Sequence, residues 1–239
     1  MKFLITGHEG FIGRNVFSHF SKKYECVGLD IKSGNDITNC ELPECDVVIH
    51  LAGLPGVRKS KEIPNEYWHN NVVGSQRIFD HAERIGAKVL YASSSSVKEW
   101  YNNPYATTKR VVEMLAPPRA LGMRFHTVYG PDSRPDMMYD MLLKNKARYV
   151  TNHMRDFTHV DDVVSAIEIL YNNKICGVVD VGPHNPVSII ELSYAAGRSL
   201  PLKAVEGEAH ITSANNTLLT SLGWAPTKHV LTEIRNDIL

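Results

Sequence analysis

The chain has 239 residues, of which 43% are hydrophobic and 22% charged, and equal numbers of basic and acidic side chains leave it without net charge. This length suits one large domain, or a large domain with a small lobe, and the neutral balance argues against nucleic acid or an anionic membrane as a partner. The apolar stretch before Gly7 is too short for a signal peptide, and no window reaches the roughly 18 apolar residues of a spanning helix. We therefore expect a cytoplasmic protein.

Strand-like and helix-like stretches alternate through the first half of the chain, which indicates βαβ units and a parallel sheet. The double proline Pro117-Pro118 is expected to end the helix that begins at Tyr105, because proline cannot donate a helical hydrogen bond. The predicted strands are Phe3–Thr6, Cys26–Leu29, Val47–His50, Val89–Ala92 and Met123–Thr127. The predicted helices are Ile12–Phe20, Glu66–Ile85, Tyr105–Leu115, Asp161–Tyr171 and Ser188–Ala196.

These elements predict an α/β fold, a Rossmann doubly wound parallel sheet with a small carboxy-terminal substrate lobe. We expect residues 1–130 to form an NAD-binding core to which 155–182 returns. Residues 131–239 would form mainly the substrate-binding lobe, with the ligand between the two parts.

The four cysteines, Cys26, Cys40, Cys45 and Cys176, lack the CxxC spacing of zinc and redox motifs. Reduced thiols with structural roles are therefore expected. No metal site is predicted.

A glycine-rich turn, Thr6 to Gly13, follows the first predicted strand and opens a helix. Gly7 permits the tight turn, Gly10 lets the backbone approach a pyrophosphate, and Gly13 allows close helix packing. Asp30 ends the second strand, where a carboxylate accepts hydrogen bonds from an adenosine ribose and repels a 2′-phosphate. A turn without a ligand is the alternative, but strand, turn, helix and acid occur together here, so we predict NAD rather than NADP.

A serine run, Ser93 to Ser96, precedes Tyr105 and Lys109, which share one face of the predicted helix. A phenol has a reference pKa of about 10, so shifting it near 7 takes roughly 4 kcal/mol. A neighbouring ammonium and a cationic nicotinamide can supply this stabilisation, while a serine hydroxyl holds the substrate oxygen. Tyrosine and lysine at this spacing also occur by chance in many helices.

Several motifs together resemble one enzyme family over nearly the whole chain. They are Thr6–Gly13, His50–Gly53, Asn71–Gly74, Tyr91–Val97, Tyr105–Lys109 and Arg155–Asp162. In this order they are typical of the extended short-chain dehydrogenases, the NAD-dependent epimerase/dehydratase family that acts on sugar nucleotides. The stretch Arg124–Pro131, followed by Arg134–Met137, looks most like UDP-glucuronate 4-epimerases.

The resemblance implies a catalytic set and a cofactor. Tyr105 would be the base, Lys109 would lower its pKa and hold the nicotinamide ribose, and Ser94 would orient the substrate. The cofactor would be NAD, and the residues implied to bind it are Gly7, Gly10, Phe11, Ile12, Gly13, Asp30, Asp36, Ile37, Leu51, Ala52, Gly53, Asn71, Tyr105 and Lys109.

The resemblance also implies a nucleotide-sugar substrate, linked to UDP. Arg155 matches an arginine that grips the diphosphate, a role that suits its bidentate fork. Thr127 and Arg134 match positions that hold the sugar and, in glucuronate epimerases, its carboxylate, and Ser95 and Ser96 would lie alongside. For Arg134 the alternative is a surface arginine in a turn.

Other polar residues are better explained without a ligand. Asp161 and Asp162 fit the first turn of a helix, where acids stabilise the positive end of the helix dipole. The histidines His8, His50 and His126 are expected to be packing or polar neighbours rather than bases or metal ligands.

Departures from the family pattern concern loops and the dimer. The stretch between Ser96 and Tyr105 is shorter than usual, so a substrate-covering loop is expected to be missing. The stretch from Asp30 to Asp36 is also compressed, which predicts the loss of a strand and helix on the adenine side. The helix cut short at Pro117-Pro118 weakens the interface of the family's usual homodimer. Finally, Val205–Glu208 stands where many relatives carry an arginine and Gly-Asp, which puts a second diphosphate contact in question.

The leading interpretation is an NAD-dependent sugar-nucleotide 4-epimerase that oxidises C4 transiently, with UDP-glucuronate or a related UDP-hexose as substrate. A dehydratase or reductase of the same family stays open, although Ser95 and Ser96 occupy the places of a dehydratase's acid and base. A catalytically idle NAD-binding sensor or interaction module stays open as well, because a fold does not fix a function. Intact Ser94, Tyr105 and Lys109 favour an enzyme.

Overall fold

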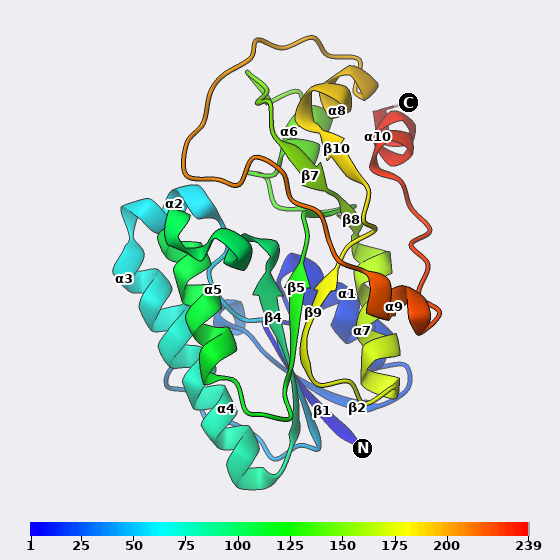
Figure 1. Cartoon of the computed structure of the whole chain (residues 1–239). Coiled ribbons are helices and arrows are strands. Elements are labelled where there is room, and N and C mark those ends of the chain that lie inside the picture. Colours follow the sequence, from blue (N-terminus) through cyan, green and yellow to red (C-terminus); the bar gives the residue numbers. More distant parts are fainter. Residues whose placement is uncertain (239) are drawn as a thin grey trace. The chain divides into compact units, whose positions relative to one another are not determined.

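The computed structural model describes residues 1–238, which fold into two compact units (Figure 1). The first compact unit contains Met1–Arg124 and Tyr171–Val179, and the second contains Phe125–Leu170 and the chain from Asp180 onward. The cofactor and substrate roles expected for the two parts of the chain stay predictions.

The first compact unit follows the predicted alternation of strands and helices. Its elements are β1 Lys2–Thr6, α1 Phe11–Phe20, β2 Glu25–Leu29, the 3-10 turn Ile31–Ser33, β3 Val47–His50, α2 Val57–Glu62, α3 Pro64–Tyr67, the π-helical segment Trp68–Val73, α4 Gly74–Ile85, β4 Lys88–Ser94, the 3-10 segment Ser95–Asn102, α5 Pro104–Leu115 and, extending one residue beyond this unit, β5 Leu121–Phe125. The first four predicted strands and the helices that begin near Phe11 and Pro104 are thereby confirmed.

The six strands of the central sheet have the order β2-β1-β3-β4-β5-β9, where β9 is Gly177–Val181. β1 pairs in parallel with both β2 and β3, and β3 pairs in parallel with β4. In the common doubly wound order another strand lies outside β2, whereas in the described chain β2 is the edge strand. Between β2 and β3 the described chain contains the 3-10 turn Ile31–Ser33 and no strand, as the compressed sequence predicted.

Both faces of the sheet are buried, which the alternation of side chains along β1 makes plain. Leu4 belongs to an apolar cluster with Ile78 and Phe79 of α4 and Val112 of α5. Phe3 points the other way, with its ring 5.4 Å from that of Phe20 in α1 and 5.2 Å from that of Tyr171. Helices therefore cover the sheet on two sides, with α4 and α5 on one and α1 on the other (Figure 1).

Two predicted elements differ from the structure. The fifth strand is Leu121–Phe125 rather than 123–127, because Gly122 interrupts the apolar run in the sequence although it belongs to the strand. A Cβ at Gly122 would lie 2.5 Å from the Tyr91 hydroxyl oxygen, so this position requires glycine. The helix predicted over 66–85 begins at Pro64 and contains the π-helical segment Trp68–Val73. Such π-helical turns occur often at functional sites.

The ends of α5 follow from its sequence. Asn103 caps the helix by accepting a hydrogen bond from the backbone N–H of Ala106 at 2.9 Å, and Pro104 occupies the first helical position. The helix ends at Leu115, ahead of the double proline, as predicted.

The second compact unit has its own core. Its elements are β6 Val128–Tyr129, α6 Met138–Leu143, β7 Met154–Asp156, β8 Thr158–His159, α7 Val160–Asn172, which extends two residues beyond this unit, β10 Pro186–Ser188, α8 Ile189–Ala195, α9 Thr217–Ser221 and α10 Val230–Ile238. β7 pairs antiparallel with β10, and β6 pairs in parallel with β8. Buried side chains that include Tyr129, Tyr139, Phe157, Leu192 and Ile234 fill the interior.

The four cysteines are free thiols, as expected. No helix within residues 1–238 combines the length and apolarity needed to cross a membrane.

Candidate active site

The glycine turn between β1 and α1 has no room for larger residues. Gly7 has a φ of +70°, and a Cβ there would lie 2.7 Å from the backbone nitrogen of Ala52. A Cβ at Gly13 would lie 1.9 Å from the carbonyl oxygen of Gly7. The N–H of Gly10 donates to the same carbonyl at 3.0 Å, which closes the turn at the start of α1. Tight backbone and a helix amino terminus together fit the pyrophosphate of a dinucleotide.

We expect Gly13→Ala to destabilise the protein by about 1 to 3 kcal/mol, because the added methyl group collides with the backbone. NAD affinity should fall at least about tenfold, since 1.4 kcal/mol corresponds to a factor of ten. Urea unfolding and NAD titration measure the two effects. Ser18→Ala on the exposed side of α1 is the control, and equal behaviour of both variants would contradict this account of the turn.

Asp30 links the end of β2 to the glycine turn. Its carboxylate is buried and accepts hydrogen bonds from the backbone N–H groups of Glu9 and Lys32, each at 3.0 Å. A carboxylate has about four acceptor sites, so capacity remains for the ribose hydroxyls predicted to bind here. The structure thus places Asp30 beside the turn, as expected for a dinucleotide site.

The segment that contains the predicted cofactor residues Asp36 and Ile37 is held by α4. The Asp36 carboxylate accepts hydrogen bonds from the N–H and the hydroxyl of Thr38, which hold the pKa of Asp36 below its usual value. Arg77 of α4 donates to the carbonyl oxygens of Ile37 and Cys40 at 2.8 and 2.5 Å. Arg77 therefore fixes the backbone of Ile37, a predicted cofactor residue.

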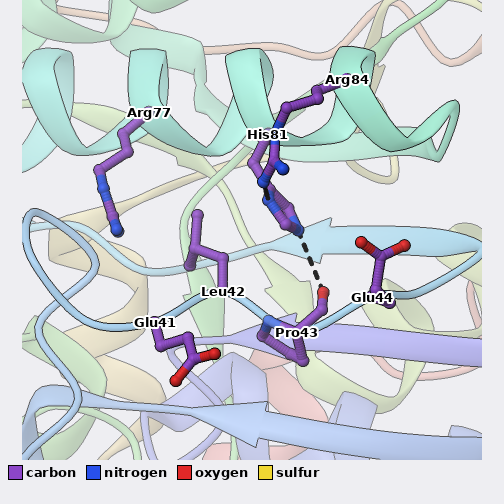
Figure 2. Close-up of a pocket in the computed structure, with 7 residues that line it drawn as sticks. All are labelled: Glu41, Leu42, Pro43, Glu44, Arg77, His81 and Arg84. Atoms are coloured by element: carbon purple, nitrogen blue, oxygen red, sulfur yellow. Dashed lines mark hydrogen bonds between the residues drawn. The ribbon is translucent and has the colours of Figure 1, made fainter.

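A pocket of about 560 Å³ lies beside this segment (Figure 2). Its basic side chains come from α4, where His81 bonds the Pro43 carbonyl oxygen at 3.1 Å and Arg84 bonds His81 at 2.8 Å. The pocket is lined by Glu41, Leu42, Pro43, Glu44, Arg77, His81 and Arg84, and none of these is a predicted site residue.

Asn71 from the π-helical segment holds Leu54, the residue that directly follows the predicted cofactor segment Leu51–Gly53. The Asn71 amide accepts from the N–H of Leu54 at 2.7 Å and donates to the Leu54 carbonyl and the Thr108 hydroxyl, both at 3.1 Å. A Cβ at Gly53 would lie 2.9 Å from the Asn71 amide oxygen. Asn71 therefore ties this segment to α5.

His50 is a polar core residue, as expected from the sequence. It is 2% exposed, and its ring nitrogens lie 2.7 Å from the Thr6 hydroxyl and 2.9 Å from the Ser75 hydroxyl. Burial, together with the charge of Lys109, lowers the pKa of His50 to about 3. The ring is neutral near pH 7 and couples β1 to α4.

The three predicted catalytic residues lie on β4 and α5. Ser94 ends β4, and its hydroxyl lies 2.7 Å from that of Ser96. Tyr105 is in the first turn of α5, with its ring 6.3 Å from that of Tyr67 in a T-shaped contact. Lys109 is 8% exposed and donates to the carbonyl oxygen of Ala92 at 3.0 Å. This bond joins the helix of Tyr105 to the strand of Ser94.

Burial lowers the pKa of Lys109 to about 8, from 10.5. The ammonium is therefore still protonated in most molecules at pH 7. Together with a nicotinamide cation, such a charge favours the ionised form of a nearby phenol. The lysine is suited to its predicted role.

The lowered pKa of Lys109 predicts a pH dependence of stability. Between pH 8 and 10.5 the unfolded chain binds more protons at this site than the folded protein does, so stability rises with pH in that window. Relative to Lys109→Met, the wild type should gain about 3 kcal/mol across it, at 1.36 kcal/mol per pKa unit. Denaturant unfolding of both proteins at several pH values measures this difference. Lys22→Met, at an exposed site, is the control and should show the same pH dependence of stability as the wild type. If Lys109→Met also showed the wild-type pH dependence, burial would have no effect on the pKa of Lys109.

Glu113, one turn beyond Lys109, anchors α5 to two strands and was not singled out from the sequence. Its side chain is 2% exposed and accepts from the Ser93 hydroxyl at 2.6 Å and twice from Arg124 at 2.8 Å. Burial by itself raises the pKa of this carboxyl, but the hydrogen bonds from Arg124 and Ser93 outweigh it, and the pKa lies below its usual value. The signal available in the sequence was the position of Glu113 four residues after Lys109, which places both side chains on one face of the helix.

The predicted substrate residues Thr127, Arg134 and Arg155 belong to the second compact unit. Thr127 follows β5, and its carbonyl oxygen accepts the N–H of Thr158 at 3.0 Å. Arg134 forms two hydrogen bonds of 3.1 Å with Asp136. Arg155 of β7 donates to the Glu208 carboxylate at 3.1 Å. Each arginine thus has a carboxylate partner.

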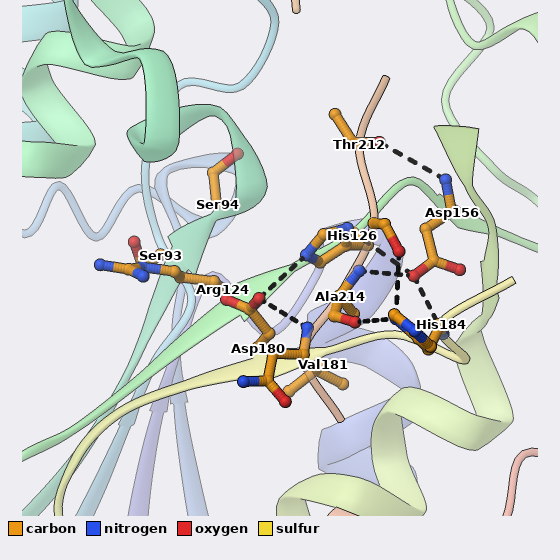
Figure 3. A network of polar contacts seen from close by, with 12 residues as sticks. Ser93, Ser94, Arg124, His126, Asp156, Asp180, Val181, His184, Thr212 and Ala214 are labelled. Atoms are coloured by element: carbon orange, nitrogen blue, oxygen red, sulfur yellow. Dashed lines mark hydrogen bonds and ion pairs between the residues drawn. The ribbon is translucent and has the colours of Figure 1, made fainter. Parts of the chain in front are cut away.

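A buried polar network, also missed from the sequence, lies around Asp156 (Figure 3). Asp156 is fully buried and accepts the backbone N–H groups of His184, Asn185 and Ala214 at 3.0, 3.1 and 2.8 Å. The ring of His126 lies between two acids, 4.0 Å from Asp156 and 3.7 Å from Asp180. The network fixes the segment around Ala214 to β7.

The two acids at the start of α7 differ in their contacts. Both lie in its first turn, as predicted. Asp161 is exposed and lies 3.4 Å from His159. Asp162 is buried and accepts from the N–H and hydroxyl of Thr227 and from the N–H of Lys228. Asp162 is therefore a tether for the carboxy-terminal segment.

A parallel sheet, a closed glycine turn before a helix, and an acid at the end of the neighbouring strand define the class, a doubly wound dinucleotide-binding protein. The chain belongs to the NAD dependent epimerase/dehydratase family, whose sequence model matches residues 3–182. It is thus an NAD-dependent enzyme of the epimerase/dehydratase type, and the family resemblance found in the motifs is confirmed.

Similar proteins cover most of the chain. Protein CapI of Staphylococcus aureus is 31% identical over 86% of this chain and 81% of its own length. UDP-glucuronate 4-epimerase 3 of Arabidopsis thaliana is 30% identical over 97% of this chain and 74% of its own. A crystal structure of UDP-glucuronic acid 4-epimerase from Bacillus cereus with UDP-glucuronic acid and NAD has a TM-score of 0.87, 27% identity, and coverage of 100% of this chain and 98% of that one.

The match to CapI extends over 277 positions, more than the 239 residues of this chain. The relative therefore has internal stretches that this chain lacks, in keeping with the shortened loops inferred from the sequence.

Proposed function

We propose that the protein is a sugar-nucleotide 4-epimerase, with UDP-glucuronate or a related UDP-hexose as its substrate. The observation that carries the proposal is the junction of β4 and α5. There the buried Lys109, one turn after Tyr105 in α5, donates a hydrogen bond to the carbonyl oxygen of Ala92, two residues before Ser94 in β4. The similarity to UDP-glucuronate 4-epimerases supports the same reaction.

Each residue of the junction has a distinct task. The Ser94 hydroxyl orients the C4 hydroxyl of the sugar, and Tyr105 takes its proton and later returns it. Lys109 supplies the positive charge that stabilises the phenolate of Tyr105. Bound NAD would supply the acceptor and donor of the C4 hydride, which must return to the opposite face of the 4-keto sugar for the configuration to invert. The glycine turn, Asp30 and the Asn71-supported segment would hold the cofactor.

The substrate's charged groups would be bound by arginines. Arg155 would take the diphosphate, and Arg134 a carboxylate on the sugar, because a guanidinium matches both groups bidentately. Thr127, Ser95 and Ser96 would contact the sugar. Ser95 and Ser96 are poor acids and bases near pH 7, so they favour epimerisation over the loss of water.

The test is to incubate the protein separately with UDP-glucuronate, UDP-glucose and UDP-N-acetylglucosamine, with and without NAD, and to follow the C4 configuration by NMR. Conversion of the glucuronate alone is expected if Arg134 reads the carboxylate, and Arg134→Met should then lose this preference. A 4-keto-6-deoxy product would indicate a dehydratase instead. No reaction from protein with NAD bound would point to another nucleotide sugar or to an idle module.

A further inference from the structure

The two arginines proposed to bind substrate anions are both paired with carboxylates of their own chain. The pairs differ in burial: the side chains of Arg134 and Asp136 are 29% and 63% exposed, whereas those of Arg155 and Glu208 are 13% and 21% exposed. Exposed ion pairs are screened and contribute little. The pair at Arg155 is therefore the one able to influence ligand binding.

The chain segment that carries Glu208 supplies several hydrogen-bond acceptors to the Arg155 guanidinium. One terminal nitrogen of Arg155 donates to the carbonyl oxygens of Met154, Ala209 and His210 at 3.0, 2.8 and 3.3 Å. The other donates to Glu208 at 3.1 Å. Backbone bonds also join the two segments, from the N–H of Met154 to the His210 carbonyl at 2.9 Å and from the N–H of Thr212 to the Met154 carbonyl at 3.1 Å. The backbone immediately after Glu208 is thus held beside Arg155.

We propose that Glu208 sets the affinity of the protein for nucleoside diphosphates. Its carboxylate occupies the arginine as an internal anion, and a diphosphate can engage Arg155 fully only by taking the place of this carboxylate. The inference rests on the proposed function, because that function assigns the diphosphate to Arg155.

The physical basis is a competition between anions for one guanidinium. An arginine with no ligand and no carboxylate would be a partly buried, uncompensated charge, which is strongly unfavourable. Glu208 removes that penalty in the free protein. A diphosphate that binds next to Glu208 meets a like charge at close range, so the carboxylate lowers the affinity for the very group that the arginine attracts.

The proposal predicts that Glu208→Gln tightens binding. A charge-assisted hydrogen bond is worth a factor of roughly ten to a hundred in a dissociation constant. We expect UDP and inorganic pyrophosphate to bind the variant about tenfold or more tightly than the wild type. The gain should shrink in high salt, and uridine, which has no phosphate, should bind both proteins equally.

Calorimetric titration of the full chain with UDP, pyrophosphate and uridine measures these affinities. Asp161→Asn is the matched control, because it removes one negative charge at an exposed site of the same compact unit, and it should change each affinity less than about twofold. Arg155→Met should lose the affinity for pyrophosphate. Thermal unfolding confirms that each variant is folded. Should Glu208→Gln fail to fold, Glu208→Asp, whose shorter side chain loosens the pair, should tighten binding in the same direction.

The outcomes separate this inference from the proposed function. UDP binding by the wild type with equal or weaker binding by the Glu208 variants would overturn the role of Glu208 and leave the epimerase proposal standing. Tighter pyrophosphate binding by the variants with no binding of UDP would support the anion competition and contradict the UDP-linked substrate. Absence of UDP and pyrophosphate binding in every variant would overturn both.

Discussion

Replacement of Tyr105 by phenylalanine should reduce turnover of the nucleotide sugar by about 10² to 10⁴-fold, the range that general acid-base groups contribute. The variant keeps the ring, and with it the T-shaped contact to Tyr67, but it loses the hydroxyl that accepts the substrate proton. Affinity for NAD should change little, because most of the predicted cofactor contacts lie on the glycine turn and on the segment held by Asn71. The measurement is kcat by NMR, together with NAD titration.

Tyr101→Phe is the matched control, since Tyr101 is 70% exposed and lies in the segment just before α5. It should keep wild-type turnover. A Tyr105→Phe protein that binds NAD and still turns over at the wild-type rate would remove Tyr105 from the mechanism. If neither wild type nor variant turns over, the idle NAD-binding module becomes the better interpretation.

Asp156→Ala should destabilise the second compact unit by about 3 to 5 kcal/mol. The substitution removes the acceptor of three backbone N–H groups, those of His184, Asn185 and Ala214, of which the one at Ala214 is buried. Each donor that stays unsatisfied costs about 1 to 3 kcal/mol, with incomplete additivity. The substitution also leaves His126 with a single neighbouring carboxylate, that of Asp180. Denaturant unfolding followed by a probe in this unit measures the loss.

Asp161→Ala serves as the control for Asp156, because Asp161 lies on the same unit with its side chain 66% exposed. Its loss should cost no more than about 1 kcal/mol, the usual contribution of an acid in the first turn of a helix. Similar stabilities of the two variants would show that the network around Asp156 relaxes to satisfy its donors. The hydrogen bonds of Asp156 would then not be needed to hold its neighbour Arg155 in position on β7.

Much of the first compact unit could be predicted because its signals are local. The apolar run of β1, the glycines before α1 and the acid after β2 lie within one βαβ unit, whose geometry admits few alternatives. The cap at Asn103 and the prolines after Leu115 bound α5, and the helical period places Tyr105 and Lys109 on one face. For such features the sequence by itself is sufficient, since the backbone constraint and the residue that satisfies it are neighbours.

Only the tertiary structure decided which distant side chains meet. Glu113 bonds Ser93 and Arg124 because β4 and β5 are neighbours in the sheet and both lie against α5, and no periodicity predicts that choice of partners. Glu208 reaches Arg155 across 53 positions of the chain, although the sequence assigned the arginine to a substrate. Burial of a charge demands a partner, but the sequence does not name it, because the partner is fixed by packing. The local pattern thus determined the class of fold and the candidate catalytic residues. The tertiary packing decided which side chains surround the candidate residues and which charged groups pair with them.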